Sequence, residues 1–160
     1  MLDQLIKLVE QNAGKDIIQN KAIPDQHNQA AIKAVAEQIF NGLKSQASAG
    51  NIQQIASMLQ GGKALGNNPI VNQLITSAAN TVATKFGVSP QVAQNMAKSL
   101  LPTVMNQLIT KTNDPKDNSF DLGGIMKTVT GNNSFDVGSI LGKTASGGLG
   151  DMLGGMFGKK

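Results

Sequence analysis

The feature that most constrains the fold of this chain is a series of apolar residues at helical spacing over its first two-thirds. These residues recur every three to four positions, the period that places them on one face of an α-helix. The apolar faces of the predicted helices span residues 2–9, 32–47, 52–59, 71–86 and 92–109. The expected fold is therefore all-α: a compact bundle of several antiparallel amphipathic helices, followed by a Gly-rich tail of short helices.

Residues that start and stop helices stand at the ends of these segments. Asn68-Pro69 and Ser89-Pro90 each place a capping side chain before a proline at the first helical position, where the missing N–H costs nothing. Asp25 and Asn51 are expected to cap two other helices through their side chains. The glycines expected to end helices are Gly14, Gly50, Gly61 and Gly87.

Pro102 lies inside the last of these predicted helices. A proline in a helix interior removes one backbone hydrogen bond and clashes with the preceding turn. We therefore expect a kink or a split near Leu100-Leu101. The residues expected in the core are Leu5, Val9, Ile32, Val35, Ile39, Leu43, Ile55, Leu59, Leu74, Ile75, Val82, Phe86, Met96, Leu100, Leu108 and Ile109.

The composition argues against catalysis. The chain has no Cys, so it lacks a disulfide framework, a thiol nucleophile and a Cys-type zinc site. His27 is the single histidine and does not suffice for a multi-His metal site. His27, Glu37 and scattered Asp residues are the candidate groups for acid–base chemistry, and no spacing unites them. We expect no enzymatic activity, catalytic residue, metal, cofactor or small-molecule substrate.

The basic charge of the chain does not indicate a nucleic-acid partner. The net charge is +4, but all 14 basic residues are Lys, and only Lys159-Lys160 are adjacent. Recognition of bases and phosphates relies on Arg forks and aromatic stacking, and the chain has no Arg, Tyr or Trp. Single, scattered lysines are typical of a solvated surface. No nucleic-acid binding is therefore expected.

The middle of the chain has an unusual charge pattern. Residues 38–113 contain no carboxylate, and their polar faces consist of Asn, Gln, Ser and Thr. The charged residues in this range are Lys44, Lys63, Lys85, Lys98 and Lys111. A weakly charged surface has little electrostatic self-repulsion to keep other surfaces away. Two interpretations remain open, a plain neutral surface and a surface covered by another protein.

The sequence divides near residue 113. Residues 1–112 are expected to form the helical domain, 113–117 a turn-rich linker and 118–160 a Gly-rich tail with a degenerate 15-residue repeat. The unit Phe120–Met126 returns as Phe135–Leu141 and, with one insertion, as Asp151–Phe157. In each of the first two units Asp is expected to cap a short helix, with Phe120 packing over Ile125 and Phe135 over Ile140 as a hydrophobic staple.

The tail also carries a stripe of small residues every fourth position. The stripe consists of Gly138, Gly142, Ser146, Gly150, Gly154 and Gly158. The apolar residues expected to make tail contacts are Phe120, Ile125, Phe135, Ile140, Leu141, Met152, Leu153, Met156 and Phe157. Glycine weakens a water-exposed helix, so such a tail gains a helix only when something packs on the stripe. That partner is either another molecule or the chain's own helical body.

Several segments carry a resemblance to a family. They are Ile23-Pro24 and the long helix after it, residues 86–90 leading to Leu100-Leu101-Pro102, and the Gly-Leu-Gly-Asp-Met-Leu-Gly-Gly-Met-Phe-Gly tail. With these segments the chain resembles the bacterial YidB-like proteins of unknown function. The resemblance implies a small, cytoplasmic, all-helical bacterial protein. It brings no catalytic residues and no established activity.

The expected role is that of a non-enzymatic assembly or scaffold protein. The tail would pack on other copies, giving a homo-oligomer, or on a protein partner. The alternative is reversible association with a membrane surface, favoured by the apolar pairs of the tail with Lys143 and Lys159-Lys160, and opposed by Asp136 and Asp151. The sequence shows no signal peptide and no transmembrane segment, so a cytoplasmic location is expected.

Overall fold

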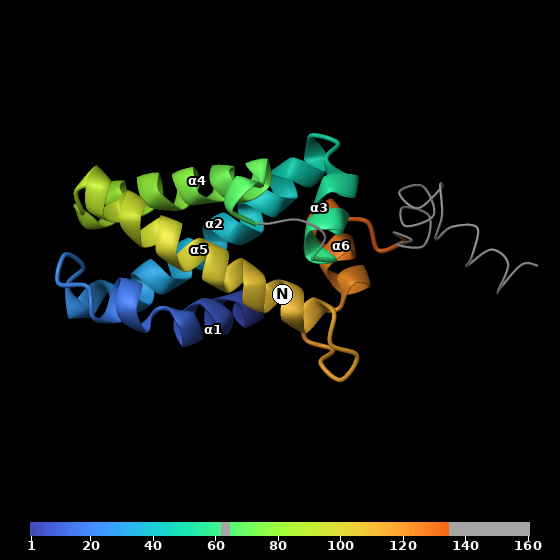
Figure 1. Ribbon diagram of the computed structural model, residues 1–160, viewed down its shortest axis with the longest axis horizontal. Coiled ribbons are helices and arrows are strands. Elements are labelled where there is room, and N and C mark those ends of the chain that lie inside the picture. Colours follow the sequence, from blue (N-terminus) through green and yellow to red (C-terminus); the bar gives the residue numbers. More distant parts are fainter. Residues whose placement is uncertain (62–64, 135–160) are drawn as a thin grey trace, which may run out of the picture.

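The computed structural model describes residues 1–61 and 65–134, and all regular structure in these ranges is helical (Figure 1). The α-helices are α1 (Leu2–Asn12), α2 (Asn28–Ser48), α3 (Ile52–Leu59), α4 (Pro69–Phe86), α5 (Pro90–Thr112) and α6 (Leu122–Thr130). A single π-turn spans Gly14–Ile18, and short 3₁₀ turns span Asp25–His27 and Leu65–Asn67. The expectation of an all-α chain is confirmed for the described residues.

The proline-based helix starts form as expected. The Asn68 side chain accepts a hydrogen bond from the Ile70 N–H at 2.9 Å, and the Ser89 hydroxyl accepts one from the Val92 N–H at 3.3 Å. Gly87 ends α4 in the left-handed conformation, with φ of +67°. A residue without Cβ adopts this conformation freely. These signals act within a few residues, so the sequence alone is enough to locate them.

Two expected caps are wrong. Asp25 lies in the 3₁₀ turn that follows Pro24, and α2 begins three residues later, at Asn28, without a side-chain cap. Pro24 has an extended backbone, and the chain enters α2 through the 3₁₀ turn that follows it. This turn stands where a side-chain cap was expected. Asn51 does stand at the N-cap of α3, but its Nδ2 donates to Gln46 Oε1 at 2.6 Å instead of the side chain accepting from the helix.

Pro102 does not split α5, which runs continuously from Pro90 to Thr112. The carbonyl that loses its donor is that of Lys98, an exposed residue where water can replace the missing N–H. On the opposite side of the proline the helix is held by side chains with no exposed surface. These are Leu100, Leu101, Val104 and Met105. Tertiary packing therefore overrides the local effect of the proline.

The α-helices contribute to one apolar core. All of the expected core residues are buried except Phe86 and Ile109, which are half-buried and pack against its edge. Phe86 ends α4, where its ring lies beside that of His27, with centroids 5.7 Å apart. Ile17 and Ile23, in the connection between α1 and α2, are also fully buried. The connection is thus part of the core as well as a link.

Helix α2 packs against α1, α3, α4 and α6, and α5 packs against α1 and α4. Helices α4 and α5 are joined by residues 87–89 and lie against each other, forming a helical hairpin. In Figure 1, α5 runs diagonally between α4 above and α1 below, in front of α2. This arrangement leaves the polar faces of α2, α3 and α4 on one side of the molecule.

Gly42 of α2 accommodates the side chain of Leu74 of α4. A Cβ placed at Gly42 would overlap the Cδ2 methyl of Leu74, and Leu74 is buried. Glycine in a helix interior is about 1 kcal/mol less favourable than alanine. Here the missing Cβ leaves the space that the Leu74 side chain fills.

The predicted linker is a folded turn attached to the helical body. The Asn113 Nδ2 donates to the Leu59 carbonyl at 3.0 Å, which ties the end of α5 to the end of α3. Asp117 accepts from the Ser119 N–H at 2.9 Å through Oδ1 and pairs with Lys111 Nζ at 3.1 Å through Oδ2. These contacts fix the direction in which the chain leaves α5.

The first part of the predicted tail packs on its own chain. Helix α6 is capped by the Asp121 carboxylate, which accepts from the Gly124 N–H at 2.8 Å, and it packs against α2 and α3. Phe120 and Ile125, the expected staple pair, are both buried in the common core. No separate core begins at residue 113 within the described part of the chain. Residues 135–160 lie outside the described ranges.

We predict opposite effects for two glycine-to-alanine changes. Gly42→Ala forces a methyl against buried Leu74, and overpacking of this kind costs about 1–3 kcal/mol against roughly 1 kcal/mol gained in helix propensity, so a net loss of up to about 2 kcal/mol is expected. Gly14 has open space at its Cβ position, so Gly14→Ala is expected to be neutral or slightly stabilising. Urea unfolding of both variants measures the difference. A Gly42→Ala variant more stable than wild type would contradict the overlap with Leu74.

We predict that Asp117 contributes pH-dependent stability. Hydrogen bonds from the Ser119 backbone and hydroxyl, with that from Lys111, hold the pKa of Asp117 below its ordinary value of 3.8. A lowered pKa stabilises the folded chain above the unfolded value, and the contribution is lost as the pH falls through the lowered value. Wild type should therefore melt above Asp117→Asn at pH 6, with the gap closing below about pH 3.8. A gap that stays constant in acid would refute this role.

Candidate functional site

A broad hollow of the described surface lies between α3 and the start of α4. Its volume is about 770 Å³, within the range of natural binding pockets. Seven of its eleven lining residues are Asn or Gln, so we call it the amide groove. It is lined by Gln46, Asn51, Gln53, Gln54, Ser57, Met58, Asn67, Asn68, Pro69, Ile70 and Gln73.

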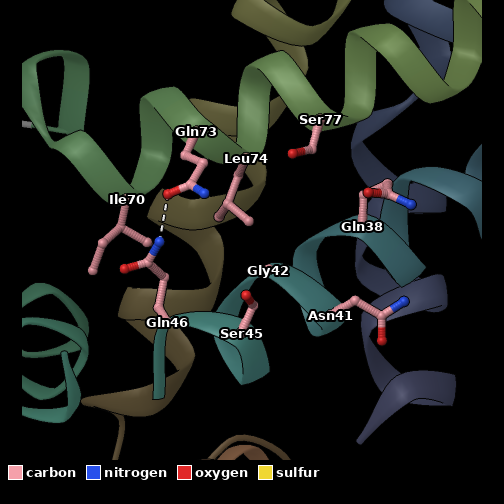
Figure 2. A pocket seen from close by; sticks show the side chains of 9 residues that line it. All are labelled: Gln38, Asn41, Gly42, Ser45, Gln46, Ile70, Gln73, Leu74 and Ser77. Atoms are coloured by element: carbon pink, nitrogen blue, oxygen red, sulfur yellow. Dashed lines mark hydrogen bonds between the residues drawn. The ribbon is translucent and has the colours of Figure 1, made fainter. Parts of the chain in front are cut away.

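A smaller hollow of about 180 Å³ continues this surface between α2 and α4 (Figure 2). It shares Gln46, Ile70 and Gln73 with the amide groove. Figure 2 shows Gln38, Asn41 and Ser45 projecting from α2, opposite Gln73 and Ser77 on α4. Gly42 and Leu74 also line this hollow. The two hollows together form one neutral surface across three helices.

A chain of side-chain amides closes the end of the groove where α2, α3 and α4 meet. The Gln46 Nε2 donates to Gln73 Oε1 across the gap between α2 and α4. The Asn51 Nδ2 donates to Gln46 Oε1 at 2.6 Å, which adds the start of α3 to the network. Gln46 therefore uses both ends of its amide to connect two neighbouring elements. The network places the polar atoms of this rim in defined positions.

The groove has neutral polar walls and apolar side chains beneath them. Every residue that lines either hollow is uncharged. Met58 and Ile70 are only 4% and 5% exposed, so they form the apolar base of the groove. Primary amides both donate and accept hydrogen bonds, as peptide groups do. The walls of the groove therefore offer both hydrogen-bond donors and acceptors and no charged side chain.

The structure brings His27 and Glu37 to one hollow of about 570 Å³, which Lys33, Lys85 and Phe86 also line. The His27 ring packs beside Phe86, with an interplanar angle of 49°. The Glu37 side chain is 33% exposed, and its Oε1 lies 4.0 Å from Lys33 Nζ, a long and solvated ion pair. No hydrogen bond joins His27 to Glu37 in the described residues.

The described ranges also contain no group of three or more His, Asp or Glu side chains that could hold a metal ion. Among the predicted tail contacts, the structure places Phe120, just before α6, and Ile125, within α6, and both are buried in the common core. The others lie outside the described residues. They are Phe135, Gly138, Ile140, Leu141, Gly142, Ser146, Gly150, Met152, Leu153, Gly154, Met156, Phe157 and Gly158.

No known protein family, curated protein or solved structure matches this chain. The resemblance to YidB-like proteins stays a prediction. Across the described residues, none of the helices has both the length and the apolar character needed to cross a bilayer. The function of the chain is therefore best approached from the geometry of its surface.

We predict that the amide network contributes measurably to stability. Gln46→Ala removes both hydrogen bonds of the network, and a net loss of about 1 kcal/mol is expected. Gln53→Ala is the matched control, because Gln53 is an exposed glutamine of the same groove that takes no part in the network. It should change the free energy of unfolding by less than about 0.5 kcal/mol. Equal effects of the two substitutions in urea unfolding would show that the network has no stabilising role.

Proposed function

We propose that this chain is a non-enzymatic assembly protein that packs on a second copy or another protein through the amide groove and its glycine-spaced tail. The observation that supports the proposal best is the continuous neutral surface of α2, α3 and α4, with amide walls and an apolar base. In this proposal the surface is a recognition surface for polypeptide.

The absence of charged side chains from the groove favours the packing of another protein surface on it, for an energetic reason. Burying a charged side chain in an interface carries a desolvation penalty that only a well-placed partner offsets. Amide side chains carry a smaller penalty, and a partner backbone can satisfy both of their hydrogen-bonding groups. Protein interfaces are depleted of charge at their centres for the same reason. The amide groove likewise has no charged side chain in its lining.

The tail supplies the second surface in this proposal. Small residues at every fourth position, from Gly138 to Gly158, would let another helix approach closely. The helical body contains a described glycine that accommodates a side chain of a neighbouring helix, Gly42 of α2 against Leu74 of α4. The tail stripe would extend that mode of packing to contacts between molecules.

We predict that a charge placed in the groove weakens self-association. Ser57 is half-buried on the α3 wall, so Ser57→Glu puts a carboxylate where an interface would exclude water. Ser99→Glu, on the exposed face of α5 outside both hollows, is the control with the same charge change. Size-exclusion chromatography with light scattering should show masses above the 16.7 kDa monomer for wild type and for Ser99→Glu. Ser57→Glu should weaken association about tenfold or more.

Two results would count against the proposal. A wild-type chain that stays at 16.7 kDa over the whole concentration range would contradict self-assembly. Equal association of Ser57→Glu and Ser99→Glu would exclude the amide groove as the surface involved. Circular dichroism of both variants checks that neither substitution unfolds the helices.

A further inference from the structure

We propose that the hollow lined by His27, Lys33, Lys85 and Phe86 binds a small organic anion that carries a flat apolar ring. Its volume of about 570 Å³ is in the range of natural ligand pockets. We call it the lysine hollow. It shares no lining residue with the amide groove or with the smaller hollow beside that groove, so the inference does not depend on the proposed function.

Three elements that pack on one another supply the lining of the lysine hollow. Helix α2 packs against both α4 and the 3₁₀ turn Asp25–His27. His27 ends that turn, and Lys85 and Phe86 are the last two residues of α4. Helix α2 contributes residues at helical spacing, which places them on one face. They are Ala30, Lys33, Ala34 and Glu37.

The apolar part of the hollow consists of an aromatic pair and a buried alanine. The rings of His27 and Phe86 lie beside each other, with centroids 5.7 Å apart. Phe86 is half-buried and packs against the edge of the core, which holds its ring in place. Ala34 is only 3% exposed and adds a flat apolar surface on α2. A planar ring can stack against such surfaces.

The charged part of the hollow consists of two ammonium groups and one carboxylate. Glu37 Oε1 lies 4.0 Å from Lys33 Nζ, so the carboxylate is associated with that lysine. Lys85 is exposed and forms no ion pair with any residue that the structure describes. Residues 38–113 contain no carboxylate, so α4 and α5 supply no counter-ion for it. An excess of positive charge in a hollow attracts anions.

His27 adds a hydrogen-bond donor to this part of the hollow. An imidazole carries at least one N–H in both its neutral and its protonated form. His27 belongs to the same lining as Lys85 and Phe86, so a ligand in the hollow can contact donor, ammonium group and ring.

These two parts together determine the class of ligand. An inorganic anion would meet the lysines and leave the rings without a partner. A neutral aromatic molecule would meet the rings and leave Lys85 without a counter-ion. An aromatic carboxylate satisfies both parts. The amide groove has no charged residue in its lining, so it lacks this combination.

The test uses the full chain and its single histidine. The His27 Cε1 proton gives one resonance in a proton NMR spectrum, and the ring current of a bound aromatic ligand shifts it. Benzoate is titrated at constant pH and ionic strength, beside benzyl alcohol, which has the ring without the charge, and acetate, which has the charge without the ring. We expect a saturable shift with benzoate, with a Kd of about 1–10 mM. Both control ligands should bind at least about fivefold more weakly.

Two variants test the charged groups in opposite directions. Lys85→Gln removes the unpaired ammonium group and should weaken benzoate binding about three- to fivefold. Lys98→Gln, on the exposed face of α5 outside the hollow, is the control with the same charge change. Glu37→Gln removes the one carboxylate of the lining and should tighten binding at least about twofold. Its control is Asp3→Asn, at an exposed position of α1. Loss of folding cannot produce a gain in affinity.

The results divide into those that support the inference and those that overturn it. A saturable shift that Lys85→Gln weakens, Glu37→Gln strengthens and both controls leave unchanged supports the site. A shift that grows with benzoate without saturation overturns it. Binding of acetate or benzyl alcohol as tight as that of benzoate also overturns it, because only one half of the ligand is then recognised. Equal effects of Lys85→Gln and Lys98→Gln overturn it as well, because the attraction then belongs to the net charge of the chain.

Discussion

The packing of the Leu74 side chain of α4 against Gly42 of α2 is the contact on which the rest of the structure depends. Helix α2 packs against four other α-helices in the described residues, and at Gly42 the missing Cβ leaves the space that buried Leu74 fills. One turn further along α2, Gln46 donates to Gln73 of α4. The same pair of helices thus supplies part of the interior and part of the polar surface above it.

Features that depend on a few neighbouring residues could be predicted from the sequence. The caps at Asn68 and Ser89 and the left-handed Gly87 follow from short-range sterics and hydrogen bonding. The continuity of α5 through Pro102 could not be predicted in this way, because it depends on the packing of Leu100 and its neighbours. The apolar period also located part of the core, because all of the residues expected there except Phe86 and Ile109 are buried. It missed Ile17 and Ile23, which lie in a connection without a helical period, and other fully buried residues such as Leu101.

The candidate site was only partly visible in the sequence. The stretch without carboxylates indicated a neutral surface, and the groove lies within that stretch. Its shape could not be predicted, because Gln46 and Gln73 are 27 residues apart and meet only through the packing of their helices. Asn51 is the clearest case. Its position before α3 predicted a cap, whereas its amide is used in the network with Gln46.

The place of α6 in the core has a consequence for how the chain is made. Helices α2 and α3 leave the ribosome long before Phe120 and Ile125, the side chains that cover their shared apolar surface. Contacts between segments so distant along the chain form late in folding, and exposed apolar surface in the interval invites aggregation. A nascent or prematurely terminated chain that lacks α6 is therefore a natural client for chaperones and proteases, whatever the finished protein does.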